Sequence, residues 1–256
     1  MTVLSSEERR VAILNMLESD ASVQVTQLAE AFGVSRVTAR ADLDALARDG
    51  KLRRTHGGAT SLSRTLTVSV QDRRVNLNVE GKRAIAKKCA PLVKDGDSIL
   101  LDSGTTSIEI VRALSGHADL TVVTDDLSIA DFVDRSMPSI DVIMLGGHLR
   151  KGHRYTNGPL ALHSLEMLHP DVAFVSPTAF APGRGFMTNN QAMAELKRAF
   201  LTCATKTYVV MDASKVGASG LMWFGNLADA DAVIMDKDPD GLVAAEVEEL
   251  YTQLII

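Results

Sequence analysis

The stretch VSRVTARADLDALARDGKLRRTHGGA, residues 34–59, decides the fold of the first part of this chain. Its first half has helical periodicity, because Ala39, Leu43 and Leu46 fall on one face at 3.6 residues per turn. Ser35 is suited to cap the start of this helix, since its hydroxyl can accept from a free amide of the first turn. The pattern predicts a helix that buries one narrow stripe.

The opposite face of this helix and the segment after it carry side chains suited to DNA. Arginine, threonine and small apolar groups match the major groove, although an ordinary solvated helix can have a similar charged face. Two glycines, at 57 and 58, allow the basic segment after the helix to turn as a hairpin. The residues predicted to contact DNA are Ser35, Arg36, Val37, Thr38, Arg40, Ala41, Lys51, Arg53, Arg54 and His56.

The residues before this helix decide between the two interpretations. Ser5 and Glu8 form a Ser-x-x-Glu capping box at the start of a first helix. Thr26 is expected to cap a short second helix over residues 27–32, and Gly33 to begin the tight turn that follows. Helix, short helix, turn, helix and basic hairpin is the order of a winged helix-turn-helix domain. We predict this domain over residues 1–60.

The distribution of charge fits a DNA-binding domain attached to an acidic one. The net charge is −5, but residues 35–60 hold six basic and three acidic residues, a local charge of +3. Residues 61–256 hold nineteen basic and twenty-four acidic residues. Aromatic residues make up 4% of the chain, too few for a platform that stacks single-stranded bases. This pattern indicates site-specific binding of double-stranded DNA.

The remaining chain predicts a larger α/β domain. Residues 61–80 are polar and lack periodicity, so we expect a linker there. Over residues 81–256, helical patterns alternate with short apolar runs, which predicts a mostly parallel sheet covered on both faces. The predicted strands include residues 98–101, 120–123, 140–145, 171–175, 207–211 and 232–235.

Several polar loops follow these predicted strands. Ligands of open α/β sheets bind beyond the carboxyl ends of the strands, and hydroxyls with free helix-start amides favour an anion. Capped helix starts and ordinary turns could account for the same residues. The predicted effector-binding residues are Asp102, Ser103, Gly104, Thr105, Thr106, Ser107, Thr124, Asp125, Asp126, Gly146, Gly147, Arg150 and Lys215, together with Glu195 and Lys197 on a helix that begins near residue 189. Their composition suits a polyhydroxylated anion such as a sugar phosphate.

Other classes of site have no support in the sequence. The phosphate-binding, dinucleotide-binding, zinc-protease and serine-hydrolase motifs are absent, and the six histidines have no metal-ligand spacing. Cys89 and Cys203 are isolated, as expected of reduced core thiols. We therefore expect no metal, no cofactor and no catalytic residue. No apolar run is long enough to span a membrane, and the first residues lack a signal core, so we expect a cytoplasmic protein.

Motifs along nearly the whole chain resemble the DeoR family of bacterial transcriptional regulators. They are ERRxxILxxL, the stretch from residue 25 to residue 59, DSGTTS, LGGHLR, NGPL, AELKR and DASKVG. The resemblance implies a sensor domain similar in fold to ribose-5-phosphate isomerase and to CoA transferases. It also implies a phosphorylated sugar as effector, with the loop of residues 102–107 and Lys215 in its pocket. Glu195 would correspond to the basic carboxylate of the isomerase.

Three positions depart from the family pattern. Arg-Arg-Asp-Leu of the family is here Arg40, Ala41, Asp42 and Leu43. Either one phosphate or base contact is therefore missing, or Ala41 meets a thymine methyl instead. The family's Thr-Asn-Ser is Thr-Asp-Asp at residues 124–126, where two carboxylates would repel a phosphate unless they bind sugar hydroxyls or point away. The family's Gly-Ala-Asp-Gly is Ser-Pro-Thr-Ala at residues 176–179, which removes an acid.

We therefore expect a sequence-specific transcriptional regulator, a repressor of a sugar-catabolic operon. Its partners would be double-stranded operator DNA and a phosphorylated sugar or related sugar acid that either releases or strengthens DNA binding. A homodimer or homotetramer is expected, since two domains would meet successive major-groove segments. The alternatives are a sugar-phosphate isomerase with an attached DNA-binding domain, and a DNA-binding module whose pocket is vestigial.

Overall fold

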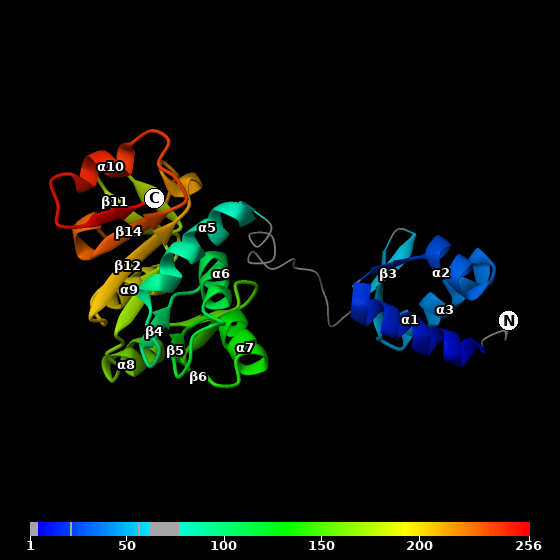
Figure 1. Ribbon diagram of the computed structural model, residues 1–256. Helices are drawn as coiled ribbons and strands as arrows, with labels where there is room; N and C mark the ends of the chain where they lie inside the picture. The colour runs from blue at the N-terminus through cyan, green and yellow to red at the C-terminus, as the bar shows by residue number, and fades with distance from the viewer. Residues whose placement is uncertain (1–4, 21, 56, 62–76) are drawn as a thin grey trace. The chain divides into compact units, whose positions relative to one another are not determined.

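The computed structural model describes residues 5–20, 22–55, 57–61 and 77–256. The chain divides into two units, residues 1–68 and residues 69–256 (Figure 1). We call them the N-terminal unit and, after the family resemblance of its motifs, the sensor unit. The division lies within the linker expected over residues 61–80. Most of that linker, residues 62–76, lies outside the described residues, so its boundaries stay a prediction.

The N-terminal unit is a winged helix-turn-helix, as its sequence predicts. Three helices are followed by a hairpin, and the sheet has the order β1-β3-β2 with both pairs antiparallel. Its elements are α1 (Ser6–Asp20), β1 (Ser22–Gln24), α2 (Val25–Phe32), α3 (Arg36–Arg48), β2 (Leu52–Thr55) and β3 (Gly58–Ser61).

Local hydrogen bonds fix the ends of these helices. The capping box of α1 is confirmed, because the Ser5 amide donates to Glu8 over 2.8 Å and the Glu8 amide donates to Ser5 over 3.3 Å. Ser35 caps α3 by accepting from the Thr38 amide at 3.1 Å. The predicted start of α2 is wrong. Gln24 rather than Thr26 precedes its first turn, and the Gln24 amide donates to the Gln27 side chain over 3.5 Å.

A buried ion pair fastens α3 to α1. Ala39, Leu43 and Leu46 are buried in a common core, as the periodicity of α3 predicts. On the same helix, the Asp42 carboxylate accepts from Arg9 at 2.8 Å and lies 3.5 Å from Arg10. The Arg9 and Asp42 side chains are only 10% and 5% exposed. These contacts hold α3 in a fixed orientation on α1.

The sensor unit is built on a parallel seven-stranded sheet with the order β15-β14-β12-β9-β4-β5-β6. An antiparallel sheet β10-β11-β13 and a hairpin β7-β8 accompany it. The elements are α5 (Val79–Cys89), η1 (Ala90–Leu92), β4 (Ser98–Leu101), α6 (Thr105–Ala113), β5 (Thr121–Thr124), α7 (Leu127–Ser136), β6 (Asp141–Met144), β7 (His148–Arg150), β8 (Tyr155–Asn157), α8 (Pro159–Glu166), β9 (Val172–Val175), β10 (Ala179–Ala181), β11 (Gly185–Thr188), α9 (Gln191–Phe200), β12 (Lys206–Met211), η2 (Ala213–Lys215), β13 (Met222–Gly225), η3 (Leu227–Asp229), β14 (Ala232–Met235), α10 (Leu242–Val247) and β15 (Gln253–Ile255).

Both faces of the parallel sheet are covered, as predicted. Alternate strand residues point to opposite faces, so Leu100 packs in one core while Ile99 and Leu101 pack in the other. Helices α5, α6 and α7 cover the face with Ile99, and α8, α9 and α10 cover the face with Leu100 (Figure 1). The carboxyl ends of β4, β9 and β12 therefore meet at one edge of the sheet.

The sensor unit begins with a constrained turn before α5. Asn78 adopts a left-handed conformation with a φ of 48°, and its side-chain amide donates to the Asp236 carboxylate over 3.3 Å. Gly81 follows closely, and a Cβ there would lie 2.5 Å from Asp236 Oδ2. These contacts attach the start of α5 to the end of β14.

No helix of the described residues is both long enough and apolar enough to cross a membrane.

The buried Asp42 predicts a specific loss of stability in the N-terminal unit. Replacing Asp42 with alanine leaves the Arg9 guanidinium buried without its carboxylate, so we expect unfolding free energy to fall by about 3–5 kcal/mol. Urea denaturation, monitored by far-ultraviolet circular dichroism, reports on the unfolding of both units. Fluorescence of Trp223, the single tryptophan of the chain, reports on the sensor unit. The urea midpoint that it measures should be the same in the variant and the wild type.

Asp44→Ala provides the matched control, because Asp44 lies on the same helix but its side chain is 58% exposed in its pair with Arg54. This variant should lose no more than about 1 kcal/mol. Equal losses for the two variants would show that the buried pair does not hold α3 in place.

Candidate functional site

The predicted DNA-contacting residues of α3 lie together on its exposed face. Arg36, Val37, Arg40 and Ala41 are exposed, and Val37 is 72% accessible although its side chain is apolar. Ser35 and Thr38 are at the start of the helix, where their hydroxyls lie 2.9 Å apart. Because the opposite face is packed on α1 and α2, this is the face of α3 that can enter a groove.

The hairpin that follows contributes further cations. Lys51 and Arg53 are exposed. Arg54 is partly buried, and it donates to Asp44 over 2.7 Å and to the carbonyl of Gly58. Arg54 therefore braces the hairpin against α3, so its charge is partly balanced. His56, also predicted to contact DNA, lies outside the described residues.

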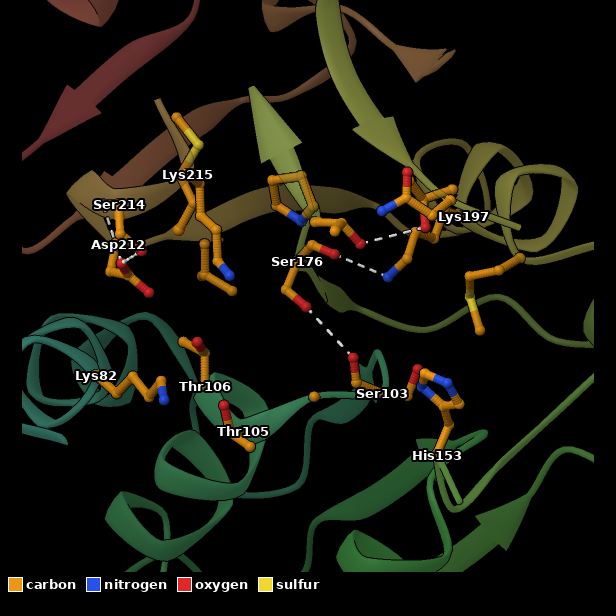
Figure 2. A pocket seen from close by; sticks show the side chains of 18 of the residues that line it. Lys82, Ser103, Thr105, Thr106, His153, Ser176, Lys197, Asp212, Ser214 and Lys215 are labelled. Atoms are coloured by element: carbon orange, nitrogen blue, oxygen red, sulfur yellow. Dashed lines mark hydrogen bonds between the residues drawn. The ribbon is translucent and has the colours of Figure 1, made fainter. Parts of the chain in front are cut away.

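The sensor unit has a cavity of about 250 Å³ at the carboxyl ends of its parallel strands (Figure 2). Seven of the predicted effector residues line it: Ser103, Gly104, Thr105, Thr106, Arg150, Lys197 and Lys215. Lys82, His153, Tyr155, Ser176, Thr178, Asp212 and Ser214 are also in its wall. Basic side chains outnumber acidic ones here, because Asp212 is the one carboxylate among the described lining residues.

A buried ion pair lies beneath the floor of this cavity. Lys197, on α9, donates to the Asp102 carboxylate and to the Ser176 carbonyl, the latter over 2.8 Å. Asp102 also accepts from the Ser176 amide at 2.7 Å. The Lys197 and Asp102 side chains are 5% and 0% exposed. This contact joins α9 to the ends of β4 and β9, so the three elements position the cavity together.

The loop between β4 and α6 forms one wall. Gly104 has a φ of 148°, which disfavours any residue with a side chain, and a Cβ there would lie 3.2 Å from Ser176 Oγ. The turn directs the first residues of α6 at the cavity, and Thr105 and Thr106 lie in its wall (Figure 2). Free amides at a helix start and hydroxyls are donors suited to a phosphate.

The two extra carboxylates of residues 125 and 126 do not face the cavity. Asp126 is fully buried, and it caps α7 by accepting from the Ser128 amide at 2.7 Å. It also accepts from the Gly104 amide at 3.2 Å, which holds the β4–α6 loop. Asp126 thus holds the loop in place, and the prediction that it binds the effector is corrected.

Asp125 is fully buried close to Asp102 and Lys197, and it does not line the cavity either. Within the described residues its carboxylate oxygens make no hydrogen bond of ordinary geometry, although the nearby Ser103 side chain acts to lower its pKa. Burial raises the pKa of Asp125 well above its usual range, and the neighbouring Asp102 carboxylate raises it further. Both effects favour the neutral acid, so Asp125 contributes little negative charge beneath the cavity.

The prediction that Glu195 binds the effector is also corrected, because Glu195 does not line the cavity. Its side chain is exposed and accepts from Gln191 over 3.0 Å. Residues two apart on a helix point in different directions, so Lys197 and Glu195 of α9 cannot both face inward. Other predicted residues lie outside the wall for different reasons. Asp102, Ser107 and Thr124 are buried behind it, and the exposed Gly146 and Gly147 precede the β7–β8 hairpin.

Some lining residues had no usable signal in the sequence. Lys82 lies on α5, and its ammonium donates to the carbonyl of Leu77. Nothing in a lysine of an amphipathic helix indicates that its side chain faces a cavity formed by loops elsewhere in the chain. Ser176 was detectable, because it follows β9 as Ser103 follows β4. Among the described residues, no cluster of three histidine, cysteine or acidic side chains could hold a metal ion.

Comparison with family models accounts for most of the chain. Residues 9–65 match the DeoR-like helix-turn-helix domain, and residues 77–237 match the DeoR C-terminal sensor domain. The second match alone spans more than half of the chain.

Named relatives align over nearly their full lengths. A protein of Escherichia coli O157:H7, whose name assigns it to repression of the aga operon, is 34% identical and covers 97% of this chain and 91% of its own. The glycerol-3-phosphate regulon repressor of Haemophilus influenzae is 29% identical, covering 97% and 96%. Among solved structures, ribose 5-phosphate isomerase A of Neisseria gonorrhoeae is 15% identical over 58% of this chain and 55% of its own, with a TM-score of 0.38.

Buried Asp125 predicts a loss of stability as pH rises. Because burial raises the pKa of Asp125 in the folded protein, the folded state binds its proton more tightly than the unfolded state does. The stability that this proton contributes is complete below the unfolded pKa of about 3.9 and declines as pH rises above it. Asp125→Asn, which mimics the neutral acid, should approach wild-type stability near pH 4 and exceed it increasingly as pH rises. Thermal melting from pH 4 to pH 9 measures this.

Asp171→Asn should behave in the opposite way. Hydrogen bonds from Ser98 lower the pKa of Asp171, so this replacement removes stability that is present at neutral pH. If Asp125→Asn melted in parallel with the wild type over the whole range, Asp125 would not be the buried neutral acid inferred here.

Proposed function

Because the chain belongs to the DeoR family of transcriptional regulators, we propose that it represses a sugar-catabolic operon under the control of a phosphorylated sugar or related sugar acid. DNA binding and regulation follow from family membership. The effector class and the operon are our proposal. The observation that carries the proposal is the cationic cavity of the sensor unit, where three lysines and one arginine accompany the start of α6.

The exposed face of α3 supports specific DNA binding. Arg36 and Arg40 offer donors for base edges or phosphates, and Val37 and Ala41 offer methyl groups for contact with thymine. The Val37 side chain is almost three-quarters exposed, which has no benefit for folding. We propose that α3 enters the major groove and that Lys51 and Arg53 of the hairpin contact phosphates nearby.

The cavity supports a small anionic effector. Its volume of about 250 Å³ is below the range of roughly 300–1,000 Å³ that is usual for ligand pockets, which suits a compact metabolite. Lys82 and Lys215 line it beside Thr105 and Thr106, so one wall combines cations, hydroxyls and helix-start amides. These are the groups that bind a phosphate.

The predicted assembly and location follow from the proposed activity. Two copies of the N-terminal unit would read half-sites about 34–36 Å apart, so we propose a homodimer or a homotetramer. Action on operator DNA places the protein in the cytoplasm. Isomerase activity is disfavoured on chemical grounds, because Glu195 faces solvent and Thr178 replaces the acid that would be needed beside it.

Arg40 provides the test of DNA recognition. Arg40→Ala should weaken binding to the operator by about 1–3 kcal/mol if the guanidinium contacts a base, and should relax the preference at that position. Fluorescence anisotropy with operator and scrambled duplexes measures both. Arg135→Ala, an exposed arginine on α7 of the sensor unit, serves as the control. Unchanged affinity and unchanged base preference for Arg40→Ala would remove Arg40 from the interface.

Thr105 and Thr106 provide the test of the effector site. A thermal-shift screen against phosphorylated sugars should identify a stabilising compound, since a ligand at 100 times its Kd adds about 2.7 kcal/mol of stability. The double variant Thr105→Ala, Thr106→Ala should lose this shift and the effector response on operator DNA, but keep operator binding without effector. Thr202→Ala, an exposed threonine after α9, controls for a general effect. A normal response in the double variant would place the effector elsewhere.

A further inference from the structure

The cavity of the sensor unit has two separate polar ends. Figure 2 shows Lys82, Lys215, Thr105 and Thr106 on one side of Ser176, and Lys197 and His153 on the other side. We call the first the lysine end and the second the arginine end, because Arg150 also belongs there. The Arg150 guanidinium donates to the Tyr155 hydroxyl, and the Tyr155 and His153 ring centroids are 5.7 Å apart.

The lysine end can hold a phosphate without help from the arginine end. It contains the first turn of α6, two hydroxyls and two ammonium groups. The single acid in its wall, Asp212, already accepts from the amide of Ser214 at 3.0 Å and from the Ser214 hydroxyl. The proposed function needs only this end, so the arginine end requires an explanation of its own.

The two cations Lys197 and Arg150 at the arginine end differ in their pairing. Lys197 is paired with Asp102 in the floor. Asp125 lies nearby, but burial favours its neutral form. Among the described residues, Arg150 forms no ion pair with a carboxylate, and its guanidinium donates to the Tyr155 hydroxyl instead. Arg150 is partly buried against the Tyr155 ring, with its guanidinium carbon 5.7 Å from the ring centroid. A partly desolvated cation beside a cavity favours an anionic ligand.

The chemistry of these side chains indicates which anion. A planar guanidinium presents parallel donors that match a carboxylate or a phosphate. Tyr155 accepts from Arg150, so its own O–H remains able to donate to a ligand oxygen. Tyr155 and Arg150 both line the cavity. Together they form a fixed pair of donors at the end opposite the lysines.

We propose that the effector carries two anionic groups, a phosphate bound at the lysine end and a second oxyanion bound by Arg150 and Tyr155 at the arginine end. This proposal rests on the proposed function and narrows its effector to a doubly anionic sugar derivative. An aldonic acid phosphate and a sugar bisphosphate both have the required chemistry, and they differ in whether the second oxyanion is a carboxylate or a phosphate.

Matched ligands test the second anion directly. We would measure Kd by isothermal titration for alditol monophosphates, aldonate monophosphates and alditol bisphosphates of four, five and six carbons. Within a matched set, the ligands differ only at the end opposite the phosphate. For wild-type protein, the doubly anionic member of the best-bound set should bind roughly ten- to a hundredfold more tightly than the alditol monophosphate. The tighter of the two doubly anionic ligands identifies the second oxyanion.

Substitutions assign this preference to Arg150. Arg150→Gln should remove the preference for the second anion, and it should weaken binding of the doubly anionic ligand much more than binding of the alditol monophosphate. Arg150→Lys, which keeps the charge but loses the planar fork, should retain part of it and guards against a folding defect. Arg154→Gln is the control, because Arg154 is four residues away, exposed, and bonded to Ser128 at 2.8 Å.

Failure of this proposal differs from failure of the proposed function. If monoanionic and doubly anionic ligands bound equally, or if Arg150→Gln weakened both equally, the second subsite would be refuted while a phosphorylated effector remained. If no phosphorylated ligand bound, or if a bound ligand left operator affinity unchanged, both the second subsite and the proposed effector would be overturned.

Discussion

The sensor site depends on one electrostatic constraint, the need to pair the buried Lys197 ammonium. Lys197 lies beneath the cavity with its side chain 5% exposed, and Asp102 and the Ser176 carbonyl supply its partners. A buried ion pair adds little net stability, but removal of one partner leaves an uncompensated charge at a large cost. The pair therefore fixes where α9 meets the ends of β4 and β9, and with them the shape of the cavity floor.

The same constraint explains how an acid-rich sequence forms a cationic cavity. Three aspartates, at residues 102, 125 and 126, come from loops that follow neighbouring strands. One is paired with Lys197, one caps α7 and holds Gly104, and one is buried in an environment that favours its neutral form. None of the three lines the cavity. The lysines and Arg150 thus determine its potential, although the unit as a whole is acidic.

Much of this architecture could be predicted from the sequence because it depends on local rules. Ser35, the buried stripe of α3 and the two-glycine turn identify the winged domain. The polar loops could be predicted to meet because the carboxyl ends of parallel strands all lie on the same side of a sheet. The failures have a different origin. The direction of Glu195 depends on which face of α9 is buried, and the part of Lys82 in the cavity depends on how α5 packs. Side-chain direction and packing between distant segments are set by the tertiary structure, so no local pattern predicts them.

The position of Leu77 and Asn78 in the cavity wall has a thermodynamic consequence. They are the first described residues of the sensor unit, and the chain leads from them back to the unit that binds DNA. The proposed effector would therefore lie against the residues through which the sensor unit continues into the linker. Linkage makes any coupling between effector and operator reciprocal. By whatever factor the effector changes affinity for the operator, the operator must change affinity for the effector, so protein on its operator and protein elsewhere would sense the metabolite over different concentration ranges.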